Sequence, residues 1–324
     1  MSYRERTIGV VVPAFNEELL IGETLRSIPD YVDRVYVVDD CSHDKTAEIV
    51  RDYEKKDSRV ECISHEVNKG VGAAIITGYK KTLEDGIDIA AVMAGDNQMD
   101  PKHLPKLLDP IVEGKADYTK GNRLLTSKFR KGMSKWRTIG NSILTFLTKV
   151  GSGYWHIMDP QNGYTAISRN ALETVNPDTI FPWYGYCNDL LVRLNVYSFR
   201  VQDVIIPAKY GLEKSKIRYR KYIPRVSWLL LKDFFWRLKM KYVILSFHPL
   251  VLFYMLGIIL IPLGIFGELY SLYYKFVLNG SIFVRGILST LLLIVGLQFL
   301  LFAMLFDMQA CGGSNRSFAA HEAQ

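Results

Sequence analysis

Two long uncharged runs near the C-terminal end place the strongest constraint on how this 324-residue chain folds. Residues 243–267 and 286–306 contain no Asp, Glu, Lys or Arg over 25 and 21 positions. A helix of about 20 apolar residues crosses the ~30 Å hydrocarbon core of a bilayer, and helices of soluble domains rarely remain apolar for so long. The runs therefore predict two transmembrane helices. The alternative is a very apolar core hairpin, which Pro249, Pro262 and Glu268 favour.

The net charge of +7 comes from one segment beside the first uncharged run. Ten Lys or Arg residues and a single acid, Asp233, lie between Lys214 and Lys241, and the rest of the chain is about neutral. The connection between the two runs holds Lys275 and Arg285 as its basic residues. The positive-inside rule then puts the N-terminal part in the cytoplasm. We expect an integral membrane protein, and no nucleic-acid partner, because the basicity is local.

These features predict four regions. They are a cytoplasmic catalytic domain (1–213), a basic amphipathic juxtamembrane segment (214–242), a two-helix transmembrane hairpin (243–307) and a short cytoplasmic tail (308–324). Residues 218–249 interleave aromatic and basic side chains, a pattern that suits helices lying at the level of the lipid headgroups. A plain membrane anchor is the compatible alternative.

The N-terminal region alternates between strand-like and helix-like patterns. Short apolar runs at 7–13, 34–40, 59–65 and 89–96 predict strands, and the spacing between them predicts helices at about 18–28, 44–57 and 70–84. This alternation is typical of an α/β fold with a mainly parallel sheet covered by helices on both faces. Ligands of such sheets bind beyond the carboxyl ends of the strands.

Polar side chains lie at the end of each of the four predicted strands, at 13–17, 39–44, 65–70 and 95–98. Asn16 and Asp44 have an alternative role as helix caps. The sequence argues against a dinucleotide-binding fold and hydride chemistry, because residues 13–18 contain no glycine and "GVGAAI" has Ile75 where the third glycine is needed. The four ends together predict a binding site for a polar ligand at this edge.

The order of the motifs resembles family 2 glycosyltransferases with a GT-A fold. The matching blocks are "VVVPAFNEE", "VVDDCSHDKT", "NKGVGAAIITGY", "GDNQMDP" and "KGNRL". With "DPQNGYTAIS", "NDLLVRLN", "KSKIR" and two C-terminal spans, the resemblance is to dolichol-phosphate mannose or glucose synthase-like enzymes, over about residues 7–310. It implies a GT-A nucleotide-sugar-binding domain. It also implies inverting transfer of one hexose from a nucleotide-diphosphate sugar to a polyprenyl phosphate at the cytoplasmic membrane face.

The resemblance also implies the roles of individual residues. A divalent metal, Mg²⁺ or Mn²⁺, is expected on Asp96 and Gln98, where relatives carry Asp-x-Asp-x-Gln and this chain has Ala94 in place of the first acid. Asp96, Arg123 and Lys216 are expected to be catalytic. Residues expected to bind the nucleotide-sugar are Pro13, Phe15, Glu17, Asp39, Asp40, Lys69, Asp96, Gln98, Arg123, Lys214 and Arg218. Sugar or acceptor contacts are expected from Asp159, Gln161, Asn188 and Asp189, with Asp159 and Asp189 on the sugar side or purely structural.

A phosphate acceptor fits the small number of histidines. A phosphate monoester is already ionised near neutral pH, so no strong general base is needed. His43, His65 and His103 have no obvious acidic partner at a fixed spacing. The expected donors are UDP-glucose, GDP-mannose or UDP-N-acetylglucosamine. The alternatives are a catalytically degenerate, membrane-docked GT-A binding protein and a transferase with a different membrane acceptor, and a homo-oligomer is left open.

Overall fold

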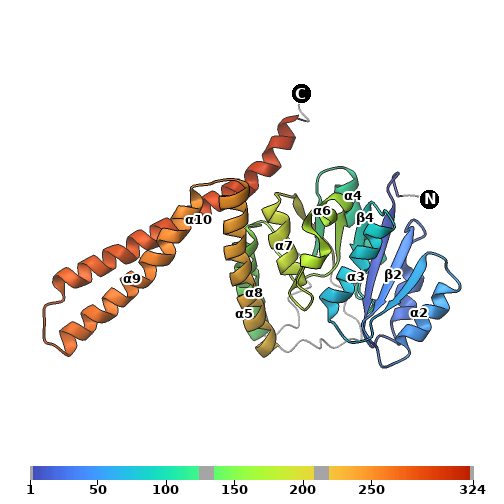
Figure 1. Ribbon diagram of the computed structural model, residues 1–324, viewed down its shortest axis with the longest axis horizontal. Helices are drawn as coiled ribbons and strands as arrows, with labels where there is room; N and C mark the ends of the chain where they lie inside the picture. Colours follow the sequence, from blue (N-terminus) through green and yellow to red (C-terminus); the bar gives the residue numbers. More distant parts are fainter. Residues whose placement is uncertain (1–2, 124–134, 208–218, 322–324) are drawn as a thin grey trace. The chain divides into compact units, whose positions relative to one another are not determined.

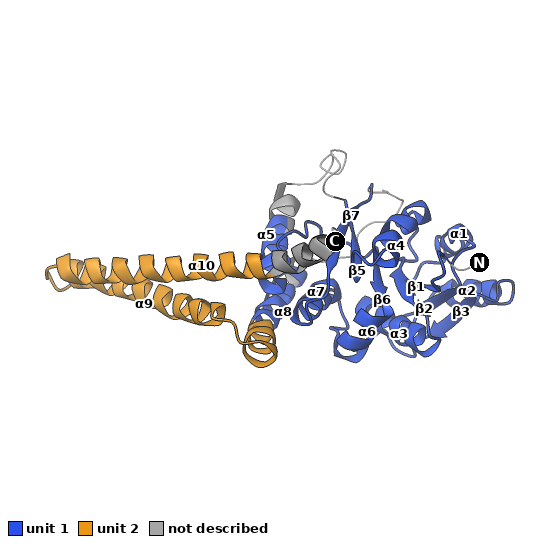
Figure 2. Cartoon of the chain, turned by 90° about the horizontal axis from the view of Figure 1, so that it is seen from above, with its two compact units in different colours: residues 1–234 blue, residues 235–324 orange. Residues whose placement is uncertain are grey.

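The computed structural model describes residues 3–123, 135–207 and 219–321 (Figure 1). The chain divides into two compact units, residues 1–234 and 235–324, which Figure 2 shows in different colours. The division falls inside one helix, α8 (Tyr219–Lys239). The first unit is an α/β domain and the second contains two long apolar helices.

The first unit alternates strands and helices through most of its length. Its elements before α8 are β1 (Ile8–Ala14), α1 (Ile21–Ser27), β2 (Arg34–Asp39), α2 (Thr46–Glu54), β3 (Val60–Ser64), α3 (Val71–Glu84), β4 (Ile89–Val92), η1 (Pro101–His103), α4 (Leu104–Val112), β5 (Tyr118–Asn122), α5 (Lys135–Ser152), β6 (Thr165–Ser168), α6 (Arg169–Val175), η3 (Pro177–Thr179), α7 (Tyr186–Val196) and β7 (Val201–Ile205). The first four strands and three helices lie where the sequence predicts them.

The described strands form one seven-stranded sheet in the order β3-β2-β1-β4-β6-β5-β7. Every neighbouring pair is parallel except those of β6, which runs antiparallel to both β4 and β5. The prediction of a mainly parallel sheet is confirmed. Because β1, β2, β3 and β4 are parallel, their carboxyl ends meet at one edge.

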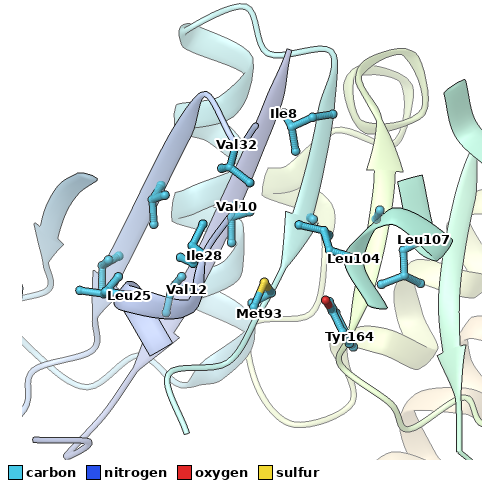
Figure 3. Close-up of a cluster of buried hydrophobic side chains, with 14 of the residues drawn as sticks. Ile8, Val10, Val12, Leu25, Ile28, Val32, Met93, Leu104, Leu107 and Tyr164 are labelled. Atoms are coloured by element: carbon cyan, nitrogen blue, oxygen red, sulfur yellow. The ribbon is translucent and has the colours of Figure 1, made fainter. Parts of the chain in front are cut away.

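The main core lies between one face of the sheet and helices α1, α2 and α4 (Figure 3). Ile8, Val10 and Val12 of β1 are fully buried and alternate along the strand, which directs them to the same face. Leu25 of α1 and Leu104 of α4 pack in the same cluster. The residues of β1 between Ile8, Val10 and Val12 are buried on the other face, so the strand is a continuous apolar run in the sequence.

Helix α3 covers the opposite face of the sheet, and a glycine, Gly78, lets it lie close to β1. A Cβ added to Gly78 would lie 2.2 Å from Cγ1 of Val11, which is closer than two carbon atoms can approach. Val11 lies between Val10 and Val12 in β1 and therefore faces away from the main core. This close contact holds α3 against β1.

The second unit contains two helices that are long and apolar enough to cross a membrane, Leu250–Phe276 (α9) and Phe283–Ala310 of α10 (Phe283–His321). They follow a π-helical turn, η4 (Met240–Leu245). Helix α9 begins after Pro249 and continues past Glu268, so it is shifted toward the C-terminus relative to the uncharged run 243–267. Proline is well suited to a helix start because it needs no amide partner there.

Small residues allow α9 and α10 to pack closely. A Cβ on Gly264 would lie 2.7 Å from the backbone nitrogen of Leu293, and a Cβ on Gly296 would lie 2.9 Å from that of Ile261. Apolar helices in a lipid environment gain little from the hydrophobic effect and depend on such close contact.

A buried ion pair lies in the same unit. Arg237 and Asp307 are 0% and 1% exposed at the side chain, and their nearest atoms, Nη1 and Oδ1, are 2.8 Å apart. Arg237 Nη2 also donates to Asp307 Oδ2 at 2.9 Å, and Tyr242 Oη donates to Asp307 Oδ1 at 2.6 Å. Two parallel hydrogen bonds of this kind give a guanidinium–carboxylate pair a defined geometry.

Candidate active site

The predicted polar residues are brought together at the carboxyl edge of the first four strands. Ala14 at the end of β1 pairs with Asp39 of β2, and Asp39 pairs with Ser64 of β3. Beyond β4, the backbone nitrogen of Gly95 donates to the carbonyl oxygen of Pro13 at 3.2 Å. Residues from four separate parts of the sequence therefore form one edge site.

The loop after β1 lies against the loop after β2. The Phe15 and His43 rings pack edge to face, with their centroids 6.3 Å apart. The backbone nitrogen of Glu17 donates to Thr46 Oγ1 at 2.8 Å. Pro13 is a buried member of β1 and contributes through its backbone, whereas Phe15 and Glu17 are partly exposed. An aromatic ring and a carboxylate at this edge suit a nucleoside, which offers a flat base and several donors.

Of the two residues for which helix capping was the alternative role, Asp44 bonds the first backbone nitrogen of α2, whereas Asn16 bonds the loop after β2 and not a helix end. Asp44 accepts hydrogen bonds from the backbone nitrogen of Thr46, at 3.0 Å, and from that of Glu18, at 3.2 Å. Asn16 accepts from the backbone nitrogen of His43 at 2.8 Å and has a positive φ of 54°. Partial burial raises the pKa of Asp44, but hydrogen bonds from the Thr46 hydroxyl and from the backbone nitrogens of Thr46 and Glu18 outweigh it, so the pKa is lowered overall.

The adjacent carboxylates Asp39 and Asp40 have different surroundings, although both residues are 3% exposed. The hydrogen bonds that the Asp39 carboxylate accepts from described residues are two long ones from the backbone nitrogen of Ser42, at 3.3 and 3.4 Å. Asp40 accepts from the backbone nitrogens of Lys69 and Gly70 at 2.9 and 2.8 Å. Asp39 is therefore better placed to accept hydrogen bonds from a ligand.

Asp40 also has a histidine partner, which corrects the expectation that no histidine has an acidic partner. His65 Nδ1 lies 2.8 Å from Asp40 Oδ1, and His65 Nε2 lies 2.9 Å from Thr77 Oγ1. The sequence could not indicate this pair, because 25 positions separate the two residues and the register of β2 on β3 brings them together.

The loop before α3 requires glycine at its end. Gly70 has a φ of +94°, and a Cβ there would lie 2.6 Å from Cε3 of Trp183. The next residue but one, Gly72, would place a Cβ 2.8 Å from the carbonyl oxygen of Pro182. Lys69, which precedes this close contact, is exposed at the edge site.

The candidate metal loop follows β4. Asp96 and Gln98 are partly exposed and share one tight turn, in which the backbone nitrogen of Gln98 donates to Asp96 Oδ1 at 3.0 Å. Asn97, between them, has a φ of 54°, and its Nδ2 donates to Glu23 Oε2 at 2.9 Å. Among the described residues, no group of three or more His, Cys, Asp or Glu side chains could hold a metal. This donor set fits an ion such as Mg²⁺ that keeps water and substrate phosphate oxygens as its other ligands.

Arg123, after β5, is held by a carboxylate from another loop. Its Nε and Nη2 donate to the two oxygens of Asp159 at 2.8 and 3.2 Å, and its backbone nitrogen donates to Asp159 Oδ2 at 3.2 Å. Asp159 is 3% exposed, whereas the Arg123 side chain is 34% exposed. Asp159 is thus placed to orient Arg123, which agrees with the structural alternative for this acid.

The remaining predicted sugar or acceptor residues are mostly buried. Asn188 is 0% exposed and Asp189 is 2% exposed. Asp189 accepts from Arg193 Nε at 2.9 Å and from the backbone nitrogen of Phe181 at 2.7 Å, and burial raises its pKa. This placement favours the structural alternative for Asp189, and in this structure Asn188 is an interior residue.

Gln161 belongs to a hydrogen-bonded chain that includes a residue absent from the sequence prediction. Its Nε2 donates to Asn188 Oδ1 at 3.1 Å, and its Oε1 accepts from Tyr222 Oη at 2.6 Å. Tyr222 lies in the first turn of α8 and packs edge to face on Tyr184 at 6.4 Å. Tyr222 was not predicted because it lies in the basic segment 214–242, which was interpreted as a membrane-surface segment.

Three predicted residues, Lys214, Lys216 and Arg218, lie outside the described residues. Their roles in closing over a diphosphate, and the catalytic role of Lys216, stay predictions.

Comparison with known proteins identifies the family. The family model described as "Glycosyl transferase family 2" matches residues 9–175, which is more than half of the chain. The fold is similar to that of glucosyl-3-phosphoglycerate synthase from Mycobacterium tuberculosis, with a TM-score of 0.55 and 21% identity, over 72% of this chain and 78% of the other. That structure contains Mn²⁺, uridine-diphosphate and phosphoglyceric acid. This protein belongs to glycosyl transferase family 2 and has a GT-A-like fold.

Two relatives are named as sugar transferases that act on a polyprenyl phosphate. A UDP-N-acetylglucosamine–dolichyl-phosphate N-acetylglucosaminyltransferase from Methanococcus voltae is 31% identical over 219 residues, covering 64% of this chain and 87% of the relative. An undecaprenyl-phosphate mannosyltransferase from Micrococcus luteus is 29% identical over 205 residues, covering 60% of this chain and 81% of the relative. The chain is a glycosyltransferase, as its motifs predicted.

Proposed function

We propose that this enzyme transfers a single hexose from a nucleotide-diphosphate sugar to a polyprenyl phosphate of the dolichyl type, with inversion at the anomeric carbon. The observation that carries the proposal is the similarity to the Methanococcus voltae enzyme over 87% of its length. The relative from Micrococcus luteus supports the same acceptor class. The donor is one of UDP-N-acetylglucosamine, UDP-glucose and GDP-mannose.

The nucleoside part of the donor is assigned to the loops after β1 and β2. The Phe15 ring offers a flat apolar surface, and the Glu17 and Asp39 carboxylates offer acceptors for base N–H and ribose O–H groups. Asp39 suits this role because its bonds from Ser42 are long and easily replaced.

The diphosphate is assigned to Asp96, Gln98, Lys69 and Arg123. A divalent metal, Mg²⁺ or Mn²⁺, would be held by Asp96 with help from Gln98 and would neutralise the leaving diphosphate. Ala94 removes one carboxylate from the usual pair. The metal would therefore bind weakly until the donor phosphates complete its ligands. The Arg123 guanidinium, oriented by Asp159, suits bidentate contact with a phosphate.

The reaction itself needs positioning more than proton transfer. An oxygen of the lipid phosphate attacks the anomeric carbon, the bond from that carbon to the diphosphate breaks, and the nucleoside diphosphate leaves. The lipid phosphate is already ionised near pH 7, so no side chain has to remove a proton. Holding the two phosphates in line and stabilising the leaving charge accounts for most of the catalysis.

Membrane attachment is proposed from two features. Helices α9 and α10 are long and apolar enough to span a bilayer, and the basic cluster at 214–241 favours a cytoplasmic catalytic unit. On α8, Trp228, Leu231 and Phe235 are 60%, 45% and 48% exposed and share one helix face. Such a face suits insertion at the headgroup level, close to where a polyprenyl phosphate headgroup lies.

The test is a donor and metal screen on the purified full-length chain in lipid nanodiscs. Each of the three labelled donors is combined with dolichyl or undecaprenyl phosphate, with Mg²⁺, Mn²⁺ or EDTA. We expect one donor to give a metal-dependent lipid product and Asp96→Ala to lower turnover at least about 100-fold, since it removes the main carboxylate ligand.

A degenerate site would behave differently in the same screen. If the chain is a membrane-docked binding protein, no donor yields a lipid product and Mn²⁺ does not strengthen nucleotide-sugar binding. Asn97→Ala is the control, because Asn97 lies in the same turn but is bonded to Glu23. Its activity should remain within about threefold of wild type, since the exposed hydrogen bond to the Glu23 carboxylate is not among the proposed donor contacts.

A further inference from the structure

A buried group of three side chains joins the end of β2 to the start of α3. The Asp40 and His65 side chains are 4% and 6% exposed, and their hydrogen bond is 2.8 Å long. The other ring nitrogen of His65 meets Thr77 Oγ1 at 2.9 Å, in the second turn of α3. We call these residues, Asp40, His65 and Thr77, the loop clamp.

The loop clamp holds backbone rather than ligand. The two oxygens of Asp40 accept from the consecutive backbone nitrogens of Lys69 and Gly70, and the Asp40 carbonyl oxygen accepts from Asn68 Nδ2 at 3.2 Å. Consecutive backbone amides that converge on one anion form a stable concave arrangement. The Asp40 carboxylate itself supplies that anion here. Asp40 is therefore already occupied, in contrast to the prediction that it shares the nucleoside with Asp39.

The histidine fixes the direction of the carboxylate. Because Asp40 accepts hydrogen bonds, His65 Nδ1 donates, and Nε2 is then the atom that meets the Thr77 hydroxyl. The histidine is braced between the β2 end and α3, and α3 is in turn fixed on β1 through Gly78. Charge-assisted hydrogen bonds of this type are short and strongly directional.

The loop clamp fixes the backbone of Lys69. Its backbone is fixed on one side by Asp40 and on the other by Gly70, whose left-handed conformation packs against Trp183. Its side chain is exposed at the edge where the donor is assigned. We propose that Asp40 and His65 are positioning residues that hold Lys69 in place for the diphosphate of the donor. This inference rests on the proposed function and assigns Asp40 a role distinct from that of Asp39.

The test compares two variants that separate the ring nitrogens of His65. In His65→Asn the amide nitrogen stands at the same number of bonds from Cα as Nδ1, so it still donates to Asp40. In His65→Leu no donor remains. Nucleotide-sugar affinity is measured on the full-length chain in nanodiscs by titration with UDP-N-acetylglucosamine, UDP-glucose and GDP-mannose, together with the melting temperature of each variant.

We expect His65→Leu to weaken donor binding about tenfold or more and His65→Asn to stay within about threefold of wild type, because one charge-assisted hydrogen bond separates them. Thr77→Val should resemble His65→Asn. A purely structural role would lower the melting temperature of His65→Leu and leave the dissociation constant of the donor unchanged, which would overturn the proposal.

A double variant checks that the effect passes through Lys69. If His65 acts by positioning Lys69, then Lys69→Ala with His65→Leu binds the donor no more weakly than Lys69→Ala alone. Additive losses would contradict the proposal. If wild type binds none of the three donors and yields no lipid product, the proposed function fails. If wild type binds and His65→Leu binds equally well, the positioning role fails while the proposed function stands.

Discussion

Arg123 reaches the proposed diphosphate site from the end of β5, and its partner Asp159 lies 36 positions away in sequence. The two carboxylate oxygens of Asp159 hold one edge of the Arg123 guanidinium and so fix its orientation. Because charge stabilisation depends on where that guanidinium stands, the anchoring acid matters as much as the arginine.

Asp159→Ala should therefore impair turnover more than donor binding. We expect kcat to fall about 10- to 100-fold, because small misplacements of a catalytic group cost that much, with a smaller change in the KM for the donor. Steady-state kinetics with the donor found in the screen measures both. Asp117→Ala is the matched control, since it breaks a similar carboxylate–arginine pair, with Arg200, outside the site. An unchanged kcat in Asp159→Ala would contradict the role.

Asp233 on α8 offers a test of stability against pH. The residue is 8% exposed, its Oδ2 is buried without a hydrogen bond among the described residues, and burial raises its pKa to about 7. Asp189 also raises that pKa, whereas Arg193 and Lys232 lower it. The folded protein thus prefers the protonated acid.

The sign of this effect follows from linkage. A carboxyl whose pKa is raised on folding stabilises the protein fully below its unfolded pKa, near ~4, and loses this contribution as pH rises to about 7. The free energy of unfolding should fall with pH in that window, by at most about 1.4 kcal/mol per pH unit. Asp233→Asn should flatten the slope and be more stable than wild type at pH 8, as thermal unfolding in detergent would measure. Asp30→Asn, at a fully exposed position, is the control and should leave both the slope and the stability at pH 8 unchanged. An equal slope in Asp233→Asn and wild type would refute this account.

Sequence patterns identified individual residues at the strand ends but not the contacts between them. Phe15, Asp39 and Asp96 were predictable because each lies at or just beyond the end of a recognisable strand. The pairs Asp40–His65 and Arg123–Asp159 were not, because their members lie 25 and 36 positions apart with no periodic relation. The register of the strands and the path of the loops decide such contacts.

Helices α9 and α10 contact each other closely through glycines, and a buried ion pair links α10 to the end of α8. Gly257, Gly264 and Gly296 leave no space for larger side chains. Close to the end of the second span, Asp307 accepts two hydrogen bonds from Arg237 and one from Tyr242. A buried pair of this kind is costly to break on one side only.

Asp307→Ala should destabilise the second unit strongly, by about 3–5 kcal/mol, because Arg237 would remain buried without its carboxylate. The double variant Arg237→Met with Asp307→Leu should recover much of this loss, since apolar residues of similar volume replace both charges. Thermal unfolding in detergent compares the two. If the single variant melts with wild type, the ion pair contributes little.

Secondary structure was predicted well where the pattern was long and regular. The helices and strands up to residue 92 match the expected positions because each apolar run is continuous. Strands β5, β6 and β7 were not predicted, since they are only four or five residues long, and the antiparallel direction of β6 was therefore not foreseen either. The start of α9 was also displaced, because apolar residues before Pro249 form a π-helical turn instead.

The chain combines a family 2 glycosyltransferase domain with two helices that can span a bilayer. A lipid phosphate acceptor would explain why the two occur in one chain, because the transferase domain would then have to work at the membrane surface. The central claim is therefore that the nucleophile is the phosphate of a polyprenyl lipid.

The decisive measurement compares dolichyl phosphate with dolichol, the same lipid without its phosphate, as acceptors for the labelled donor in vesicles containing the full-length chain. The account predicts that label enters lipid only with the phosphate, in a product whose mass equals dolichyl phosphate plus one anhydrohexose or N-acetylhexosamine unit. Equal labelling of dolichol, or no lipid-linked label with any of the three donors, would contradict it.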